Sequence, residues 1–272
     1  MKAPGSDRNF DDLSEKFARK VYGGLKGDIR LAVIWRDLLA VQPELESPSQ
    51  TPIRILDVGG GLGQLSIRLA KAGHQVVYND LSGQMLSAAQ QAAEQAGVKE
   101  RIIWLQGPYQ QLGSILSSQK RPGQKPPEQF DLVLCHALME WLAEPPALIN
   151  ALRAWLAPNG LLSLTFYNQN ALIYRNLVRG NFHVLEGEFS ADPGSLTPGT
   201  PLQPDTVQQW VQGAGLTTEY SSGIRVFHDY ITTQRGGHTD ASAVIDMELR
   251  HSVQEPFKWL GRYIHFICGF SK

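Results

Sequence analysis

The chain has 272 residues, of which 42% are hydrophobic and 19% charged, and its formal net charge at pH 7 is −1. This composition is typical of a globular protein and excludes fibrous and intrinsically disordered chains. A near-neutral charge gives no support to binding of nucleic acid mainly through phosphate contacts, although it leaves room for a local basic patch.

The cysteines and the termini indicate the cellular environment. Cys135 and Cys268 each lie in an apolar run outside any CxxC spacing, which predicts buried thiols rather than a zinc site or a disulfide. The N-terminus lacks the apolar segment of a secretory signal, and the sequence has no stretch of about 18 apolar residues for a membrane span. We therefore expect a cytoplasmic protein with no membrane or metal partner, and we infer no obligate protein partner.

Helices come first, and strands and helices then alternate. Apolar residues recur at helical spacing over 9–43, in two runs separated by glycines, and a polar linker at 46–52 follows. The predicted strands are 53–58, 74–80, 101–106, 130–137 and 161–168, the last opened by Gly160. The predicted helices are 65–73, 82–96 and 145–157, the second capped by Ser82. This alternation indicates a doubly wound, mostly parallel sheet.

The remaining chain completes one predicted domain. It contains loops at 117–128 and 186–205, a helix at 204–214, and strands near 217–228 and 262–269. We predict a Rossmann-like α/β domain over 1–272 with a seven-stranded sheet, N-terminal helices and an inserted substrate cap. It is expected to have four parts. These are a helical segment over the cofactor site (1–45), a cofactor-binding core (53–168), a cap (169–205) and C-terminal substrate-side elements (206–272).

A glycine-rich loop follows the first strand and reads Asp57-Val58-Gly59-Gly60-Gly61-Leu62-Gly63. The dinucleotide-binding pattern Gly-x-Gly-x-x-Gly is broken here by Gln64, and the Asp57 carboxylate would repel a pyrophosphate. S-adenosylmethionine carries a sulfonium and an ammonium but no phosphate, so these residues favour it over NAD and a methyltransferase over an oxidoreductase. Asp57 either faces the ligand at the strand end or caps the loop through backbone N–H groups.

Asp80 ends the second strand, about 20 residues after the glycine loop, where an acid accepts hydrogen bonds from both ribose hydroxyls. Its alternative role is as an N-cap for the helix that begins near Ser82. Because both cofactors contain ribose, Asp80 does not separate S-adenosylmethionine from NAD.

These motifs resemble known families. ILDVGGGLG, YNDLS, FDLVLCHALMEW and LAPNGLLSLTFYN resemble the class I S-adenosylmethionine-dependent methyltransferases. Four further segments resemble the bacterial tRNA 5-carboxymethoxyuridine methyltransferases: RNFDDLSEKFARKVYGGLKGDIR (8–30), NLVRGNF (176–182), GIRVFHDY (223–230) and QEPFKWLGRYIHF (254–266). That resemblance covers nearly the whole chain and implies methyl ester formation on the carboxylate of the modified wobble uridine of tRNA.

The resemblance also implies roles for single residues. Around the glycine loop, including Gly61, it implies a cofactor site made of Arg30, Gly59, Gly60, Asp80 with Leu81, Tyr109, Gln110 and His136. Members of the family carry a lysine run near 187–200, whereas that loop contains no lysine here, so tRNA contacts from such a run are not expected. Lys120, Arg121 and Lys125 of the 117–128 insert either compensate for it or belong to a solvated loop.

The expected chemistry needs little acid–base help. A carboxylate with a pKa of about 4 is ionised at pH 7, and orientation alone supplies about 7–11 kcal/mol, so we predict no catalytic base. The acceptor carboxylate needs a cationic holder, for which arginine is suited. The candidates are Arg225 and Arg262, with Tyr167, Asn168, His228 and Tyr230. Alternatively, Arg225 and Asp229 form an internal ion pair on one strand face, and His136 and His228 are structural histidines.

Tyr174, Phe182 and Trp259 are candidates for stacking on anticodon bases, and Arg175 and Arg179 for binding phosphates. Alternatively, all three aromatic residues belong to the core, an interpretation that is favoured most for Trp259. Two alternatives remain open: a methyltransferase for a small or carrier-bound carboxylate, and a non-catalytic module that senses S-adenosylmethionine.

Overall fold

A seven-stranded sheet in the order β3-β2-β1-β4-β5-β7-β6 forms the centre of this computed structural model, which describes residues 23–47, 51–118, 129–186, 198 and 200–271. Predictions for residues 1–22, the basic residues of the 117–128 insert and the segment 187–197 lie outside the described residues. The strands are β1 (Arg54–Val58), β2 (Gln75–Asp80), β3 (Ile102–Gln106), β4 (Phe130–His136), β5 (Leu156–Tyr167), β6 (Leu216–Ile224) and β7 (Tyr263–Phe270). Strands β1 to β5 are parallel, and β7 runs antiparallel between β5 and β6.

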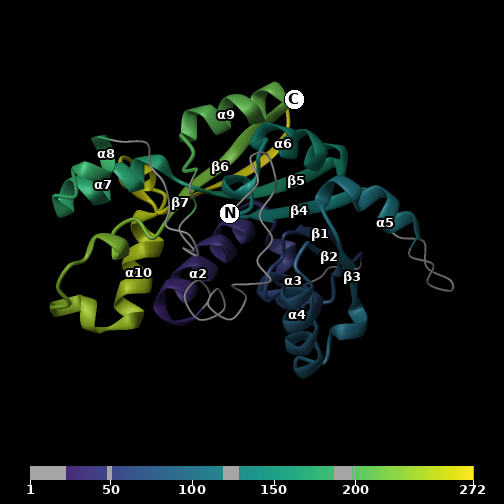
Figure 1. Cartoon of the computed structure of the whole chain (residues 1–272). Coiled ribbons are helices and arrows are strands. Elements are labelled where there is room, and N and C mark those ends of the chain that lie inside the picture. The colour runs from purple at the N-terminus through teal and green to yellow at the C-terminus, as the bar shows by residue number, and fades with distance from the viewer. Residues whose placement is uncertain (1–22, 48–50, 119–128, 187–197, 199, 272) are drawn as a thin grey trace.

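Helices cover both faces of the sheet (Figure 1). One face packs against α5 (Leu112–Ser118), α6 (Pro145–Ala154) and α9 (Pro204–Gly213), and the other packs against α2 (Gly24–Val41), α3 (Gln64–Lys71), α4 (Gly83–Gln95) and α10 (Ala241–His251). Two more helices, α7 (Gln169–Arg179) and α8 (His183–Glu186), follow the end of β5. The predicted doubly wound, mostly parallel fold is confirmed.

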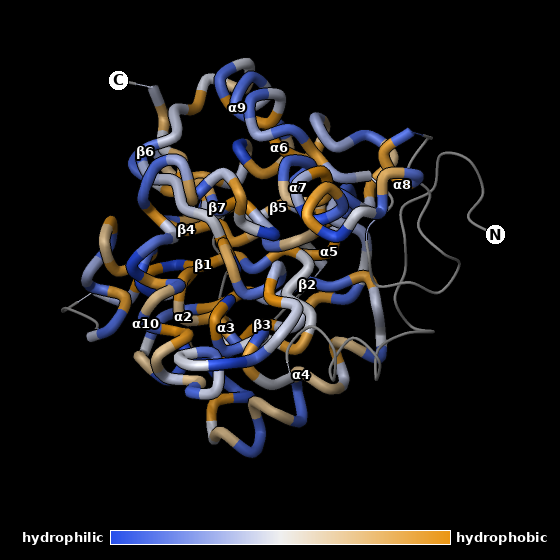
Figure 2. Tube along the Cα trace, turned by 90° about the vertical axis from the view of Figure 1, so that its left-hand side faces the viewer, coloured by the Kyte–Doolittle hydropathy of each residue, from blue (hydrophilic) through white to orange (hydrophobic). Residues whose placement is uncertain are grey.

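Alternation along each strand builds the two cores. In β4, Val133 and Cys135 belong to the core beneath α6, whereas Leu132 and Leu134 belong to the core beneath α3. All four are fully buried, as the apolar runs of a sheet covered on both faces require. Figure 2 shows hydrophobic stretches along the central strands and mostly hydrophilic loops around them. Both cysteines are buried free thiols, as predicted.

The predicted strand at 217–228 is wrong over its last four residues, because β6 ends at Ile224. Arg225 has φ +60°, in the left-handed region that extended strands do not use. The next three backbone N–H groups, of residues 226–228, donate to the Glu248 carboxylate at 2.7, 3.2 and 2.9 Å instead of to a neighbouring strand. The expected alternation of side chains over 225–230 is therefore replaced by a turn.

Three other features of the secondary structure differ from expectation. Helix α10 is not predicted, although Asp240 caps it by accepting from the backbone N–H groups of Ser242 and Ala243. Helix α6 ends at Ala154 and β5 starts at Leu156, before Gly160 rather than after it. Gly27 lies inside α2 instead of interrupting a helix. Among the described residues, we find no helix with the length and apolar character of a membrane span.

Candidate active site

The glycine loop leaves the end of β1 and is tied to the end of β2. The N–H groups of Gly59 and Gly60 donate to the carbonyl oxygen of Asn79, at 2.9 and 3.0 Å. Gly59 has φ +69°, and a Cβ on Gly60 would lie 2.5 Å from the ring of Tyr78. Neither position accommodates a side chain without strain, so the backbone itself lines the pocket here.

Asp80 holds this loop from the end of β2. Its Oδ2 accepts a hydrogen bond from the N–H of Gly61 at 2.9 Å, and its Oδ1 accepts one from the N–H of Ser82 at 2.8 Å. Ser82 is the N-cap of α4, as predicted, because its hydroxyl oxygen accepts from the N–H of Met85. A carboxylate oxygen accepts more than one hydrogen bond, so these contacts are compatible with ligand hydroxyls at the same group.

Asp57 lies in β1 beside the loop and lines the same pocket. Its Oδ2 accepts a hydrogen bond from the hydroxyl of Ser66 at 2.6 Å. Burial raises the pKa of Asp57 to about 6, although the Ser66 hydrogen bond opposes this and the charge of Asp80 adds to it. Because ionising a buried carboxylate is unfavourable, a cationic ligand beside Asp57 would be favourable.

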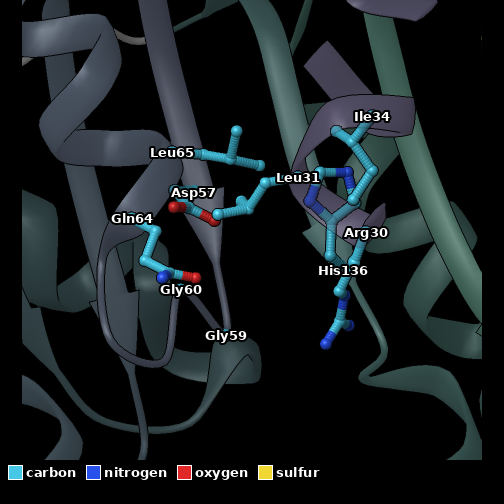
Figure 3. Close-up of a pocket in the computed structure, with 9 residues that line it drawn as sticks. All are labelled: Arg30, Leu31, Ile34, Asp57, Gly59, Gly60, Gln64, Leu65 and His136. Carbon is cyan, nitrogen blue, oxygen red and sulfur yellow. The ribbon is translucent and has the colours of Figure 1, made fainter. Parts of the chain in front are cut away.

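The opposite wall comes from α2 and from the end of β4. Arg30, Leu31 and Ile34 of α2 line the pocket together with His136. Figure 3 shows Arg30 and His136 across the pocket from Asp57 and the glycine loop. A carboxylate and a guanidinium on facing walls suit a ligand that carries both an ammonium and a carboxylate.

His136 is a neutral member of this wall. Its Nε2 lies 2.8 Å from the hydroxyl oxygen of Ser163. Burial lowers the pKa of His136 well below its usual range, and the guanidinium of Arg30 lowers it further. The pocket therefore gains no positive charge from His136 at pH 7.

A cluster of arginines adjoins the pocket through one aromatic ring. The Cζ atoms of Arg30 and Arg225 lie 5.1 and 5.6 Å from the ring centre of Tyr263. Arg225 and Arg262 both contact the carboxylate of Asp229, with N–O distances of 3.4 and 3.7 Å. The expected Arg225–Asp229 ion pair therefore exists, although on a turn rather than on a strand face.

This cluster has an excess of positive charge in a buried place. The side chains of Arg225, Arg262 and Asp229 are only 12, 12 and 10% exposed. Burial alone would raise the pKa of Asp229, but the two guanidinium groups lower it below its ordinary value. Within the described part of the chain, the Nε of Arg225 and the hydroxyl of Tyr167 have no hydrogen-bond partner. Two cations, one anion and unused donors match the needs of an anionic ligand.

Asn168, another predicted substrate residue, has its side chain occupied by the fold. Its Nδ2 donates to the carbonyl oxygens of Trp259 and Gly261, both at 2.8 Å. Its Oδ1 accepts from the N–H of Asn170 and so caps α7. Asn168 therefore supports the site by fixing the start of α7. Trp259 packs against the core, as expected.

His228 and Tyr230 lie in the 3-10 turn His228–Tyr230. The Tyr230 hydroxyl donates to the carbonyl oxygen of Leu260 at 2.5 Å, and its ring packs against Tyr174 with 5.1 Å between ring centres. The Nδ1 of His228 has no hydrogen-bond partner within the described residues. This turn thus joins the arginine cluster to the first turns of α7.

The other predicted cofactor residues lie outside the set that lines the pocket: Gly61, Asp80, Leu81, Tyr109 and Gln110. Tyr109 and Gln110 form a 3-10 turn after β3, and Leu81 follows Asp80. Their contacts with a cofactor stay predictions. Conversely, Gln64 and Leu65 line the pocket although the sequence analysis gave them no ligand role. Their position directly after Gly63, at the start of α3, is the signal that identifies them.

Comparison with curated proteins identifies relatives along nearly the full length. The chain is 40% identical over 260 residues to the tRNA 5-carboxymethoxyuridine methyltransferases of Escherichia coli O157:H7 and strain K12, covering 95% of this chain and 95% of each relative. The ubiquinone biosynthesis O-methyltransferase of Psychrobacter arcticus is 28% identical over 171 residues, which are 63% of this chain and 62% of that protein. The model of the methyltransferase domain family matches residues 56–162.

Solved structures share the fold at low sequence identity. Magnesium protoporphyrin IX methyltransferase from Synechocystis PCC 6803 with bound SAH has a TM-score of 0.58 and 16% identity, over 96% of both chains. The plantazolicin methyltransferase BamL in complex with an analog and SAH has a TM-score of 0.57 and 14% identity, over 96% of this chain and 90% of that one. The likeness establishes the class I methyltransferase fold.

Proposed function

The chain belongs to the tRNA 5-carboxymethoxyuridine methyltransferase family, and from this premise we propose that it converts the 5-carboxymethoxyuridine at the wobble position of tRNA to its methyl ester. The chain is a methyltransferase, and its cofactor is S-adenosylmethionine. The observation that carries the ester assignment is the buried arginine cluster that adjoins the cofactor pocket through Tyr263.

The pocket residues fit S-adenosylmethionine, which supplies the methyl group on its sulfonium. Asp57 would face its cationic groups, and Arg30, on the opposite wall, would hold its carboxylate. Asp80, at the end of β2, would accept from the ribose hydroxyls. Gly60, where a Cβ would overlap Tyr78, lets the backbone approach the ligand.

Arg225 and Arg262 would hold the acceptor carboxylate, with the Tyr167 hydroxyl as a further donor. The three groups come from the end of β6, the start of β7 and the end of β5. Because β5 and β6 run parallel, their ends meet at the edge of the sheet where the glycine loop also lies. Donor and acceptor would thus meet at one edge.

The reaction needs positioning rather than proton transfer. Methyl transfer to an ionised carboxylate forms one O–C bond, breaks one S–C bond and releases no proton. Two guanidinium groups keep the carboxylate ionised and orient it, and orientation contributes about 7–11 kcal/mol in favourable cases. We therefore assign no general base.

Helix α7 would receive the anticodon. Tyr174 lies in this helix and is 41% exposed, Arg179 is the last residue of the helix, and Phe182, three residues further on, is 55% exposed. Exposed aromatic rings stack on unpaired bases, and arginines bind phosphates. We assign residues 169–205 to this cap, 1–45 to the segment over the cofactor, 53–168 to the cofactor-binding core and 206–272 to the acceptor side of a single domain.

The test is mass spectrometry of nucleosides from tRNA of cells that make 5-carboxymethoxyuridine, incubated with the protein with and without S-adenosylmethionine. We expect loss of the free acid that depends on the cofactor, with a matching gain of the methyl ester. No change, in protein shown to bind S-adenosylmethionine, would contradict the tRNA assignment and favour a small or carrier-bound carboxylate.

A further inference from the structure

A buried chain of hydrogen bonds runs from the pocket wall to α2. His136 Nε2 lies 2.8 Å from Ser163 Oγ, which lies 2.8 Å from His265 Nε2. His265 Nδ1 in turn lies 2.7 Å from Asp37 Oδ2. Ser163, His265 and Asp37 are fully buried, whereas His136 lines the pocket. The four residues come from β4, β5, β7 and α2, so the chain crosses the sheet.

Asp37, at the far end of these hydrogen bonds, determines which atoms donate and which accept. Asp37 Oδ1 accepts from Nε and Nη2 of Arg36 at 2.8 and 2.5 Å, and its Oδ2 accepts from the hydroxyl of Ser222. A carboxylate with these donors is an acceptor, so Nδ1 of His265 must carry the proton that it shares with Asp37. In neutral His265 the other ring nitrogen, Nε2, then accepts.

The donor and acceptor roles of Ser163 and His136 follow from those of His265. Ser163 Oγ has one proton and two histidine neighbours, so it donates to Nε2 of His265 and accepts from Nε2 of His136. His136 is then the neutral tautomer with its proton on Nε2, which leaves Nδ1 as an acceptor. Burial lowers the pKa of His136 well below its usual range, in agreement with a neutral ring.

We infer that Asp37, His265 and Ser163 are positioning residues that fix the ring orientation and the tautomer of His136 at the cofactor pocket. An accepting Nδ1 suits a ligand with ammonium and sulfonium groups, whereas an N–H at that position would direct a positive dipole at them. The inference rests on the proposed role of His136 at the cofactor, but it does not depend on the identity of the methyl acceptor.

The Asp37→Asn variant is expected to exchange donors and acceptors along this series of hydrogen bonds. Arg36 supplies two donors to one side of Asp37, so the amide oxygen stays there and the NH₂ group faces His265 and Ser222. His265 Nδ1 must then accept, its Nε2 donates to Ser163, and Ser163 donates to His136 Nε2. The proton of His136 moves to Nδ1.

The Ser163→Ala variant removes the hydroxyl that joins His136 to His265, and Ser222→Ala is its matched control. Both serines are buried in strands and hydrogen-bonded within the same network, but only Ser163 lies between Asp37 and His136. Similar losses of melting temperature are expected from the two changes. Only Ser163→Ala should alter His136.

The measurement is two-bond ¹H–¹⁵N correlation spectroscopy of the ligand-free protein labelled with ¹⁵N-histidine, with His136 assigned from the His136→Asn spectrum. We expect the proton on Nε2 in the wild type and in Ser222→Ala, and on Nδ1 in Asp37→Asn. Calorimetry with S-adenosylmethionine should show Kd raised about tenfold by Asp37→Asn and Ser163→Ala, the equivalent of one hydrogen bond.

Either of two results overturns the inference. One is a wild-type His136 with its proton on Nδ1. The other is a Ser163→Ala protein whose His136 spectrum and cofactor Kd match those of Ser222→Ala. Neither readout requires tRNA or methyl transfer, so a failure here is distinguishable from a failure of the proposed reaction.

Discussion

The two sides of the proposed active site are built in opposite ways. On the cofactor side, the backbone of one short loop lies between two acids, Asp57 and Asp80, that are 23 positions apart and on neighbouring strands. On the acceptor side, Arg225 and Arg262 come from different strand ends and converge on Asp229. One side carries negative charge and the other an excess of positive charge.

The difference corresponds to the charges of the two proposed reactants. A sulfonium donor is attracted to acids, and an ionised carboxylate is attracted to guanidinium groups, so each side would select its own reactant and reject the other. The ring of Tyr263, with Arg30 and Arg225 against it, lies between the two sides. Substitutions on one side should therefore affect the binding of one reactant only.

The largest effect is expected from Asp80→Ala on the cofactor side. The change removes the acceptor for the N–H groups of Gly61 and Ser82 and for the ribose hydroxyls, and each hydrogen bond to a charged group contributes about 1.5–3 kcal/mol. Calorimetry should show the Kd of S-adenosylmethionine raised by at least about 100-fold. The affinity for tRNA should stay within about twofold.

Asp131→Ala is the matched control for this change. Asp131 also accepts from a backbone N–H, that of Arg54, and from the Arg54 guanidinium, but it lies where β4 begins, at the edge of the sheet away from the loop. Its loss should lower stability without changing the cofactor Kd. An unchanged Kd in Asp80→Ala would remove the ribose role.

The next largest effect is expected from Arg262→Gln on the acceptor side. It removes one of two cations proposed to hold the carboxylate, so kcat/KM with tRNA should fall about 10- to 100-fold. The cofactor Kd should not change, because Arg262 contacts Asp229 and Tyr167 rather than the pocket walls. Arg54→Gln, which also removes an arginine paired with an aspartate, is the control. If Arg262→Gln raised the cofactor Kd and left kcat/KM for tRNA otherwise unchanged, Arg262 would not belong to a separate acceptor side.

The contrast between the sides also determines what the sequence predicts. The cofactor side is local: Asp57 and the glycines are contiguous, and Asp80 ends the next strand, so hydrophobic patterns and strand ends suffice to place them. The acceptor side depends on where distant segments converge. Arg225 was predicted to lie on a strand, but the buried Glu248 of α10 takes the backbone N–H groups that a strand would use.

The buried hydrogen bonds from Asp37 to His136 cannot be predicted from the sequence, for the same reason. Asp37 is one polar residue in an apolar helix, and His265 and Ser163 interrupt apolar strands without any shared spacing. Only the order β4-β5-β7, with α2 packed across it, brings them together. Each position could have been noted as a polar residue in a buried run, which must find a partner.

A smaller effect is expected from Asp57→Asn, and it depends on pH. The folded-state pKa of Asp57, about 6, lies above the value of 3.8 for an exposed aspartate, so its contribution to stability is fully present below about pH 4 and is lost as the pH rises through 6. At pH 8 the ligand-free variant should therefore be more stable than the wild type, by up to about 3 kcal/mol. Urea unfolding at pH 4.5 and pH 8 measures the difference, which should shrink to about 1 kcal/mol at the lower pH.

The same substitution should weaken cofactor binding about tenfold at pH 8, because a neutral amide does not attract the cationic groups. Wild-type affinity should fall below pH 6, as Asp57 becomes protonated, and the affinity of the variant should not follow it. A variant that is less stable than the wild type at pH 8, or a wild-type affinity that is constant from pH 5 to 8, would contradict this account.

The smallest effect is expected from Arg179→Gln, which tests how far the cationic side extends along α7. Arg179 is exposed, and its Nη2 donates to the carbonyl oxygen of Asp229, which joins α7 to the arginine cluster. If it binds one tRNA phosphate, the Kd for tRNA should rise about two- to threefold, and the slope of log K against log salt should fall by about 0.7–0.9. Arg101→Gln, directly before β3, should change neither quantity. Equal salt slopes for both variants would confine the cationic side to the buried cluster. Stacking on Tyr174 of α7 and on Phe182, just after that helix, would then be the contact of this region with tRNA.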